Sequence, residues 1–224
     1  MTSGKFSLFH LVREPRQAPS AAPPLLLLLH GIGSNERDLF SMAPALDSRF
    51  FVVSARAPIQ MMPDAYAWFN LEFTPEGTAI PDVDQAKVSV KLLVSFIDEL
   101  VETYGVDRRC VYLMGFSQGA MMSLSVALTR PDKVARVVAM SGRLPEEVVA
   151  NAGPLERVRQ LEVFVTHGTY DNVLPVDSGR SCRDRLEELG VPLTYREYPM
   201  AHEVSMEALR DVTGWMRSKL DAGC

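Results

Sequence analysis

The sequence predicts an α/β fold in which a doubly wound, mostly parallel sheet carries helices on both faces. Short, near-continuous apolar runs recur along the chain, amphipathic helical patterns lie between them, and no repeat or linker divides the 224 residues. Continuous apolar runs are typical of strands that are buried on both faces, as in parallel sheets. Strands that alternate with helices are joined by right-handed crossovers. We therefore expect residues 1–224 to form a single domain.

The strands are predicted from the apolar runs, after a proline-rich stretch, Pro15–Pro24, that is typical of a loop. The more mixed runs Phe6–Val12 and Leu193–Tyr198 are predicted to be edge strands. The inner strands are predicted at Leu25–His30, Phe51–Ala55, Cys110–Phe116, Val134–Met140 and Leu161–His167.

The helices are predicted from apolar residues that recur at steps of three and four. The first helix begins after Asp82, which forms a capping-box pattern with Gln85, and ends at Gly105. Its apolar face consists of Ala86, Val90, Leu93, Ile97, Leu100 and Tyr104. Three more helices are predicted at Gln118–Leu128, Val176–Leu189 and Glu203–Leu220.

Composition excludes several function classes. The net charge of −5 argues against nucleic-acid binding, which needs a basic face, and against docking to an anionic membrane. The apolar run Leu25–Leu29 is far shorter than the roughly 20 residues that a membrane span needs. It is not expected to be a signal peptide either, because the small residues Ala18–Pro24 precede the run, whereas a cleavage site would follow it. Cys110, Cys182 and Cys224 have unrelated spacings that are typical of free thiols. We therefore expect a cytoplasmic protein.

One motif indicates a reaction. The residues Gly115-Phe116-Ser117-Gln118-Gly119 match G-x-S-x-G, follow a predicted strand and open a predicted helix. This is the setting of a nucleophile elbow, a sharp turn that raises the serine hydroxyl above the sheet edge, where side chains in place of the flanking glycines would clash. The alternative is an ordinary strand–helix turn in which Ser117 only caps the helix. The chain has no phosphate-binding loop and no H-E-x-x-H zinc motif, so we expect neither metal nor cofactor.

A serine nucleophile needs a base, and the base needs a carboxylate that orients it. Among the four histidines, His202 is the candidate base, because it follows every acidic candidate and so fits the order serine, acid, histidine. His10 belongs to an N-terminal strand. His30 and His167 each end a strand before a glycine and fit structural histidines that bond to backbone.

The candidate acid is Asp171, because it follows a strand by a short turn and so lies at the same sheet edge as Ser117. Two rivals stay open at this point. Asp132 follows a helix, at the opposite edge of the sheet, and Asp177 begins a helix, where a carboxylate is expected in any case.

An oxyanion hole needs two backbone donors. One is the N–H group of Gln118, directly after the nucleophile, and the other comes from a loop after an early strand. The loop His30-Gly31-Ile32-Gly33 has glycines that let its backbone approach a substrate, and the N–H group of Ile32 is the best candidate. The alternative is a plain tight turn.

Together these residues make the chain resemble the phospholipase/carboxylesterase family of α/β-hydrolases, which includes acyl-protein thioesterases and small bacterial carboxylesterases. The matching stretches run in family order: Leu29-His30-Gly31-Ile32-Gly33-Ser34-Asn35-Glu36 with Asp38-Leu39, Ala67-Trp68-Phe69, Gly115-Phe116-Ser117-Gln118-Gly119-Ala120, His167-Gly168-Thr169 with Asp171 and Val173-Leu174-Pro175-Val176, and Tyr198-Pro199-Met200-Ala201-His202-Glu203-Val204.

The resemblance implies a single-domain α/β-hydrolase fold without a large cap domain. It also implies Ser117 as nucleophile, Asp171 as acid and His202 as base, with Ile32 and Gln118 as oxyanion donors. Ala201 departs from the family pattern, because a glycine usually precedes the histidine. The loop of His202 has to accommodate the added methyl group.

The longest segment without a clear pattern is Ile59–Pro81. An irregular loop of more than about 12–15 residues is uncommon unless it has a function. We interpret it as a lid or as the wall of an acyl pocket, with Trp68, Phe69 and Leu71 as substrate-binding residues. The alternative is that its aromatic residues pack as a small satellite core.

The leading hypothesis is a cytoplasmic serine carboxylesterase that hydrolyses short-to-medium acyl esters of small molecules through an acyl-enzyme intermediate. The same residues would serve an acyl-protein thioesterase, a lysophospholipase, a lyase or a perhydrolase. A non-catalytic binding protein with this fold is the alternative of a different class. We expect no nucleic-acid partner and no stable membrane insertion, and homodimer formation is left open.

Overall fold

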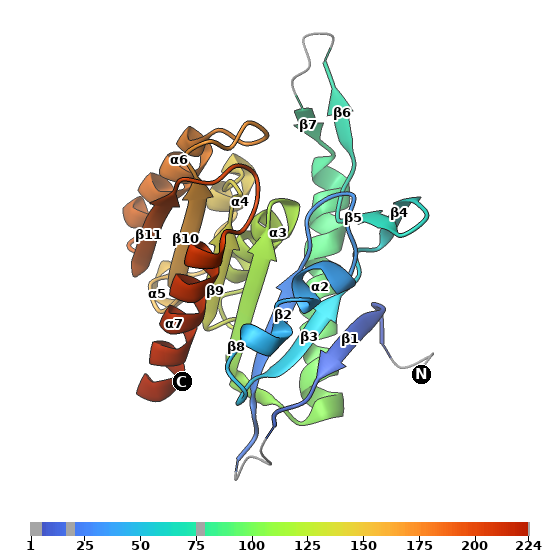
Figure 1. The fold of residues 1–224 in the computed structure, drawn as a ribbon, viewed down its shortest axis with the longest axis vertical. Helices are drawn as coiled ribbons and strands as arrows, with labels where there is room; N and C mark the ends of the chain where they lie inside the picture. The colour runs from blue at the N-terminus through green and yellow to red at the C-terminus, as the bar shows by residue number, and fades with distance from the viewer. Residues whose placement is uncertain (1–5, 17–20, 75–78, 224) are drawn as a thin grey trace.

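The computed structural model describes residues 6–16, 21–74 and 79–223. Within these residues the main sheet has seven strands in the order β1-β3-β2-β8-β9-β10-β11 (Figure 1). Their bounds are β1 His10–Arg13, β2 Pro24–Leu29, β3 Phe51–Ala55, β8 Asp107–Phe116, β9 Arg136–Met140, β10 Glu162–Gly168 and β11 Leu193–Tyr198. Only β1 runs antiparallel to its neighbour, so the mostly parallel sheet is confirmed. Both edge strands are present, although the first begins at His10, four residues later than expected.

The helices in the described part of the chain are α1 Arg37–Phe40, α2 Val83–Tyr104, α3 Gln118–Thr129, α4 Glu146–Ala150, α5 Leu155–Val158, α6 Val176–Glu188 and α7 Met206–Ala222. The four long helices are confirmed. The last begins at Met206, three residues later than expected, because the side chain of Ser205 accepts a hydrogen bond from the N–H of Ala208 and caps the helix there. The short helices α1, α4 and α5 were not predicted, since four or five residues show no helical period.

Helix α2 has the termini that its sequence predicts. The Asp82 side chain accepts a hydrogen bond from the N–H of Gln85, and Gly105 ends the helix with a left-handed φ of 65°. The Gln85 side chain, however, does not return to Asp82. Its oxygen accepts the N–H of Asn70 at 2.8 Å, so the start of α2 holds the segment that precedes it.

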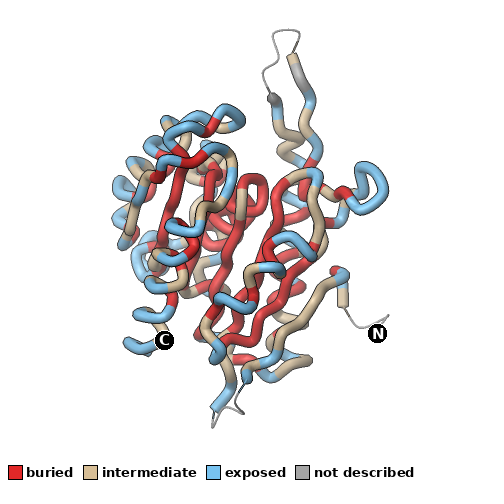
Figure 2. Tube along the Cα trace, viewed as in Figure 1, coloured by how far each residue is buried: buried red, intermediate tan, exposed pale blue. Residues whose placement is uncertain are grey.

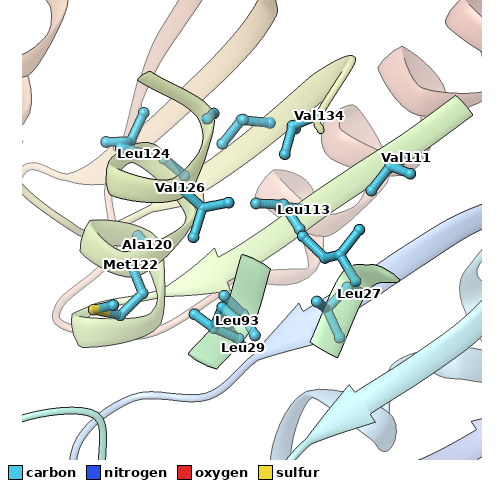
Figure 3. Packing of buried hydrophobic residues seen from close by; sticks show 14 of the residues in the cluster. Leu27, Leu29, Leu93, Val111, Leu113, Ala120, Met122, Leu124, Val126 and Val134 are labelled. Carbon is cyan, nitrogen blue, oxygen red and sulfur yellow. The ribbon is translucent and has the colours of Figure 1, made fainter. Parts of the chain in front are cut away.

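The inner strands of the sheet consist almost entirely of buried residues (Figure 2), and their side chains divide between two apolar cores. Along β2, the leucines alternate. Leu25, Leu27 and Leu29 belong to the core under α2, α3 and α6, and Figure 3 shows this cluster beside α3. The other two belong to the core under α1 and α7. One continuous apolar strand thus serves two cores, which explains why its sequence shows no polar alternation.

The segment Ile59–Pro81 is not the irregular loop that we expected. Its described residues form two short hairpins, β4 Ile59–Met62 with β5 Ala65–Ala67 and β6 Leu71–Phe73 with β7 Ala79–Pro81. The second hairpin projects from the body of the molecule (Figure 1). Strands of three or four residues are too short for a period-two pattern, which is why the sequence did not predict them.

The cysteines correct one expectation. Cys182 is a free, buried thiol, and burial raises its pKa to about 12. Cys110 is disulfide-bonded, so the expectation of three free thiols is wrong. Spacing alone could not show this pairing, and Cys224 lies outside the described residues. Among the described residues, no helix has the length and apolar character to cross a membrane.

Candidate active site

Ser117 lies in a strained turn between β8 and α3. Its φ of 53° and ψ of −115° are unusual for a residue with a side chain. The flanking glycines permit the turn: a Cβ atom on Gly119 would lie 1.9 Å from the carbonyl oxygen of Leu29, and one on Gly115 would lie 2.2 Å from that of Gly119. The Ser117 side chain makes no helix-capping hydrogen bond, so the capping alternative is wrong.

Three parallel strands deliver the three predicted triad residues to one edge of the sheet. Ser117 follows the end of β8, Asp171 follows β10, and His202 lies between β11 and α7. A hydrogen bond of 2.9 Å joins the Ser117 Oγ to the His202 Nε2, and one of 2.7 Å joins the His202 Nδ1 to the Asp171 Oδ2. Since a carboxylate only accepts, Nδ1–H is the donor and Nε2 is free to accept the serine proton.

Asp171 is held firmly, and its side chain has no exposed surface. While Oδ2 faces His202, Oδ1 accepts the backbone N–H groups of Val173 at 2.9 Å and Leu174 at 2.8 Å. These bonds fix the carboxylate toward the imidazole. Neither rival is near: Asp132 pairs with Arg130, and the exposed Asp177 pairs with Arg180.

The other histidines bond to backbone, as the sequence suggested for two of them. His167 donates from Nε2 to the carbonyl of Leu174 at 2.8 Å. His30 accepts the Ala57 N–H at Nε2, and therefore its Nδ1–H donates to the Gly31 carbonyl at 2.7 Å. Burial lowers the pKa of His30, so its ring stays neutral and holds the loop after β2 in place.

The two expected oxyanion donors are unused within the described structure: no hydrogen bond there employs the backbone N–H of Ile32 or of Gln118. The loop of Ile32 is nevertheless fixed on both sides. Gly33 donates to the Tyr66 carbonyl at 2.9 Å, and Tyr66 donates to the Ser34 carbonyl at 2.8 Å. Free donors in a fixed loop are what an oxyanion hole requires.

Glu36, just beyond this loop, forms an ion pair that the sequence did not reveal. Its carboxylate is almost fully buried and receives two hydrogen bonds from Arg56, at 2.6 and 2.8 Å. The Arg56 guanidinium holds the pKa of Glu36 below its ordinary value. The pair links the start of α1 to the residue after β3, across 20 residues of sequence.

The three predicted substrate-binding residues have different environments. Phe69 lines an apolar cavity of about 610 Å³ between α2, α3 and α4, and Leu71 is half-buried against the core. Trp68 is fully buried and does not line the cavity, so the alternative of a packed core residue describes it. The other apolar residues of the cavity lining are Pro81, Val83, Ala86, Val90, Val94, Met121, Met122, Pro145 and Val148.

Ala201, the departure from the family pattern, causes no conflict. It is exposed and is not among the described residues with a left-handed φ, so its backbone conformation does not need a glycine. His202, the next residue, keeps both of its hydrogen bonds.

Known proteins resemble this chain in sequence and in fold. A family model described as phospholipase/carboxylesterase matches residues 11–219. The acyl-protein thioesterase 1 of Kluyveromyces lactis is 30% identical over 92% of this chain and 96% of the relative. Among solved structures, esterase PE8 is 27% identical with a TM-score of 0.81, over 96% of this chain and 99% of its own. A carboxylesterase of Bacillus cereus, 24% identical with a TM-score of 0.77 over 95% and 94% of the two chains, shares the fold. The chain belongs to the phospholipase/carboxylesterase family of α/β-hydrolases.

Proposed function

We propose that this protein is a serine carboxylesterase that hydrolyses acyl esters through an acyl-enzyme intermediate. Ser117 is the nucleophile, His202 the general base and Asp171 the acid that orients it. The observation that supports this assignment most strongly is the unbroken hydrogen-bond chain from Asp171 through His202 to Ser117. Membership of the phospholipase/carboxylesterase family supports the same class of reaction.

The reaction follows from these contacts. The Ser117 hydroxyl attacks the ester carbonyl while His202 Nε2 takes its proton, and the negative oxygen of the tetrahedral intermediate accepts the N–H groups of Ile32 and Gln118. His202 then protonates the leaving alcohol as the C–O bond breaks, which leaves an acyl group on Ser117. A water molecule, deprotonated by His202, releases the acid and regenerates the serine.

The acyl chain belongs in the cavity that Phe69 lines. Ser117 and His202 do not line this cavity themselves. The cavity shares the start of α3 with the nucleophile, because the N–H of Met121, another of its lining residues, bonds to the carbonyl of Ser117 at 3.1 Å. Each buried methylene contributes about 0.8 kcal/mol, so an apolar wall favours longer chains until the cavity is full. We therefore propose short-to-medium acyl esters of small molecules as substrates.

A thioester is the second candidate substrate class. The Kluyveromyces lactis relative at 30% identity is named an acyl-protein thioesterase. The same steps cleave a thioester, with a thiol in place of the alcohol as leaving group.

For the location of the protein we propose the cytoplasm. Free cysteines no longer support this proposal, because Cys110 is disulfide-bonded. Subcellular fractionation tests it.

Labelling with a fluorophosphonate tests the proposal. An activated serine forms a covalent adduct, and peptide mass mapping should place the adduct on Ser117. A matched panel of esters and thioesters of graded acyl length then ranks the two substrate classes by kcat/KM. A protein that takes no label and hydrolyses no member of the panel is a non-catalytic binding protein, and the proposal fails.

A further inference from the structure

Gln118 has a second set of contacts, through its side chain. The side chain is buried, and its amide binds two consecutive residues of the segment before β6. Its Oε1 accepts the N–H of Trp68 at 2.7 Å, and its Nε2 donates to the carbonyl of Phe69 at 2.7 Å. The Gln118 amide thus gives this backbone one hydrogen-bond acceptor and one donor, as a neighbouring β-strand would.

Trp68 extends this connection to the loop after β2. Its indole Nε1–H donates to the carbonyl of His30 at 3.0 Å, although the ring has no exposed surface. The Trp68 carbonyl accepts the hydroxyl of Ser89 on α2. Trp68 therefore uses its backbone N–H, its carbonyl and its indole, and each binds a different element.

The loop after β2 that carries the proposed donor Ile32, residues 30–34, is anchored to the same segment; we call it the oxyanion loop. Gly33 and Ser34, which follow Ile32, exchange hydrogen bonds with Tyr66, and His30, which precedes it, receives the Trp68 indole. The loop that carries Ile32 and the side chain of Gln118 are thus both hydrogen-bonded to one stretch of chain, residues 66–69. We call this stretch the strap.

The strap also borders the acyl cavity, because Phe69 lines it. An oxyanion hole is effective only when its donors are placed beforehand, and a misplacement of about 1 Å can cost on the order of 10²-fold in rate. The Phe69 carbonyl is the acceptor of the Gln118 side chain. An acyl chain that contacts Phe69 therefore affects a residue to which Gln118 is directly bonded.

We infer that the Gln118 side chain and the Trp68 indole are positioning groups that couple the wall of the acyl cavity to the two oxyanion donors. Selectivity for acyl-chain length then appears in kcat and not in KM alone. This inference rests on the proposed function and adds a role for the Gln118 side chain, which approaches no reacting atom. In this role the backbone N–H of Gln118 is one of the two oxyanion donors, and the side-chain amide of Gln118 helps to position both of them.

Gln118→Glu tests the inference with almost no change in shape. The variant keeps the backbone N–H and the acceptor for Trp68, but it replaces the donor to the Phe69 carbonyl with a carboxylate oxygen. Gln85→Glu is the matched control. Gln85 also binds the segment next to the strap, at Asn70, but only as an acceptor, a role that a glutamate retains.

The measurements are kcat and KM for acetyl and octanoyl esters of one alcohol, and the inhibition constants of trifluoromethyl ketones with the same acyl lengths. These ketones form a tetrahedral adduct with the serine and so report on the oxyanion hole, which KM does not. For Gln118→Glu we expect kcat to fall at least tenfold on the octanoyl ester and less on the acetyl ester. KM should stay within about twofold, and the octanoyl ketone should bind correspondingly more weakly. Gln85→Glu should match the wild type.

A higher KM with unchanged kcat would overturn the inference, because Gln118 would then shape the cavity only. Equal losses of kcat on the acetyl and octanoyl esters would also overturn it, as would equal losses of kcat in Gln118→Glu and Gln85→Glu. If Gln118→Glu does not fold, Trp68→Phe decides: it removes the indole donor to His30 together with part of the buried ring, so thermal melting has to show an intact fold, and kcat should fall at least threefold in the same pattern. An inert wild type that takes no fluorophosphonate would overturn the proposed function itself, whereas an active wild type with unaltered variants overturns the inference alone.

Discussion

Asp171 shows how closely one residue can be specified by its surroundings. Its two oxygens accept three N–H groups, one from His202 and two from the backbone that follows it. The same turn that places the carboxylate also determines its direction. A substitution that keeps the shape of this side chain but alters its charge therefore tests its chemical role separately from its packing.

Asp171→Asn should lower kcat by about 10⁴-fold with little change in KM, because an amide group facing His202 favours the wrong tautomer of the imidazole. Steady-state kinetics on an aryl ester measures this. Asp177→Asn is the control: its side chain is exposed and pairs with Arg180, so kcat should stay within twofold. A severe loss in Asp177→Asn would reverse the assignment of the acid.

At the scale of elements, the crossing of β2 and α3 determines where the nucleophile lies. Gly119 lies so close to β2 that a methyl group there would overlap the carbonyl of Leu29, which belongs to a strand and cannot move alone. The elbow and the oxyanion loop, which follows β2, are therefore positioned by the same contact.

Gly119→Ala should destabilise the protein by about 3 kcal/mol or more, since the overlap is with backbone and not with a flexible side chain. Thermal melting measures the change. Gly214→Ala is the matched control, because Gly214 is exposed within α7 and a Cβ atom there would meet nothing within 4 Å. That variant should be more stable by about 0.8–1 kcal/mol, as alanine exceeds glycine in helix propensity. Equal effects in the two variants would contradict the close approach of β2 and α3.

The Glu36–Arg56 pair makes the stability of the α1 region depend on pH. Arg56 lowers the pKa of Glu36 in the folded protein, so the pair contributes fully above the unfolded pKa of about 4.3 and is lost as pH falls through the lower folded value. Glu36→Gln should cost about 2 kcal/mol at pH 7. Urea titrations should show this difference from the wild type shrink below pH 4.

Asp184→Asn is a suitable control for the Glu36 variant. Its side chain is more than half exposed and pairs with Arg183, an interaction worth about 0–1 kcal/mol. It should change the free energy of unfolding far less at pH 7. A Glu36→Gln variant as stable as the wild type at pH 7 would show that the buried pair has no net stabilising effect.

At the scale of the whole molecule, two apolar cores enclose the sheet, and three chain segments meet at the edge where Ser117, Asp171 and His202 lie. The sequence predicted this arrangement because β2 and the Cys110–Phe116 part of β8 are continuously apolar and α2 has clear caps. Sequence order also predicted that Ser117, His202 and Asp171 would meet, since strand ends lie at one edge in a parallel sheet, and the structure brings their side chains into hydrogen-bond contact.

The remaining features depend on contacts that no local pattern encodes. Gln118 binds Trp68 across 50 residues, and Glu36 binds Arg56 across 20. A glutamine after the nucleophile was expected only to offer its backbone N–H. Every residue of α3 from Gln118 to Leu128 is buried. A buried side-chain amide needs hydrogen-bond partners, so the burial of this helix could have indicated that the Gln118 side chain binds other residues.

The cavity that we propose for the acyl chain is lined by residues of α2, α3 and α4, so its size is a property of the whole fold. Ala86→Leu would fill part of the cavity from α2, and each methylene of substrate that it excludes should cost about fourfold in kcat/KM. The octanoyl-to-acetyl ratio of kcat/KM should therefore fall at least fourfold. Val88→Leu, on the exposed face of the same helix, should leave the ratio unchanged. An unchanged ratio in Ala86→Leu would place the acyl chain elsewhere.

The most direct test of the account is the turnover of Ser117→Ala beside the wild type, on an aryl ester of short acyl length, with thermal melting as the check on folding. Removing a triad residue costs on the order of 10³-fold or more, and alanine lacks the hydroxyl that His202 contacts at 2.9 Å. We predict an intact melting transition, a loss of at least this size and no fluorophosphonate adduct. A folded variant that retains the turnover of the wild type would contradict the serine mechanism.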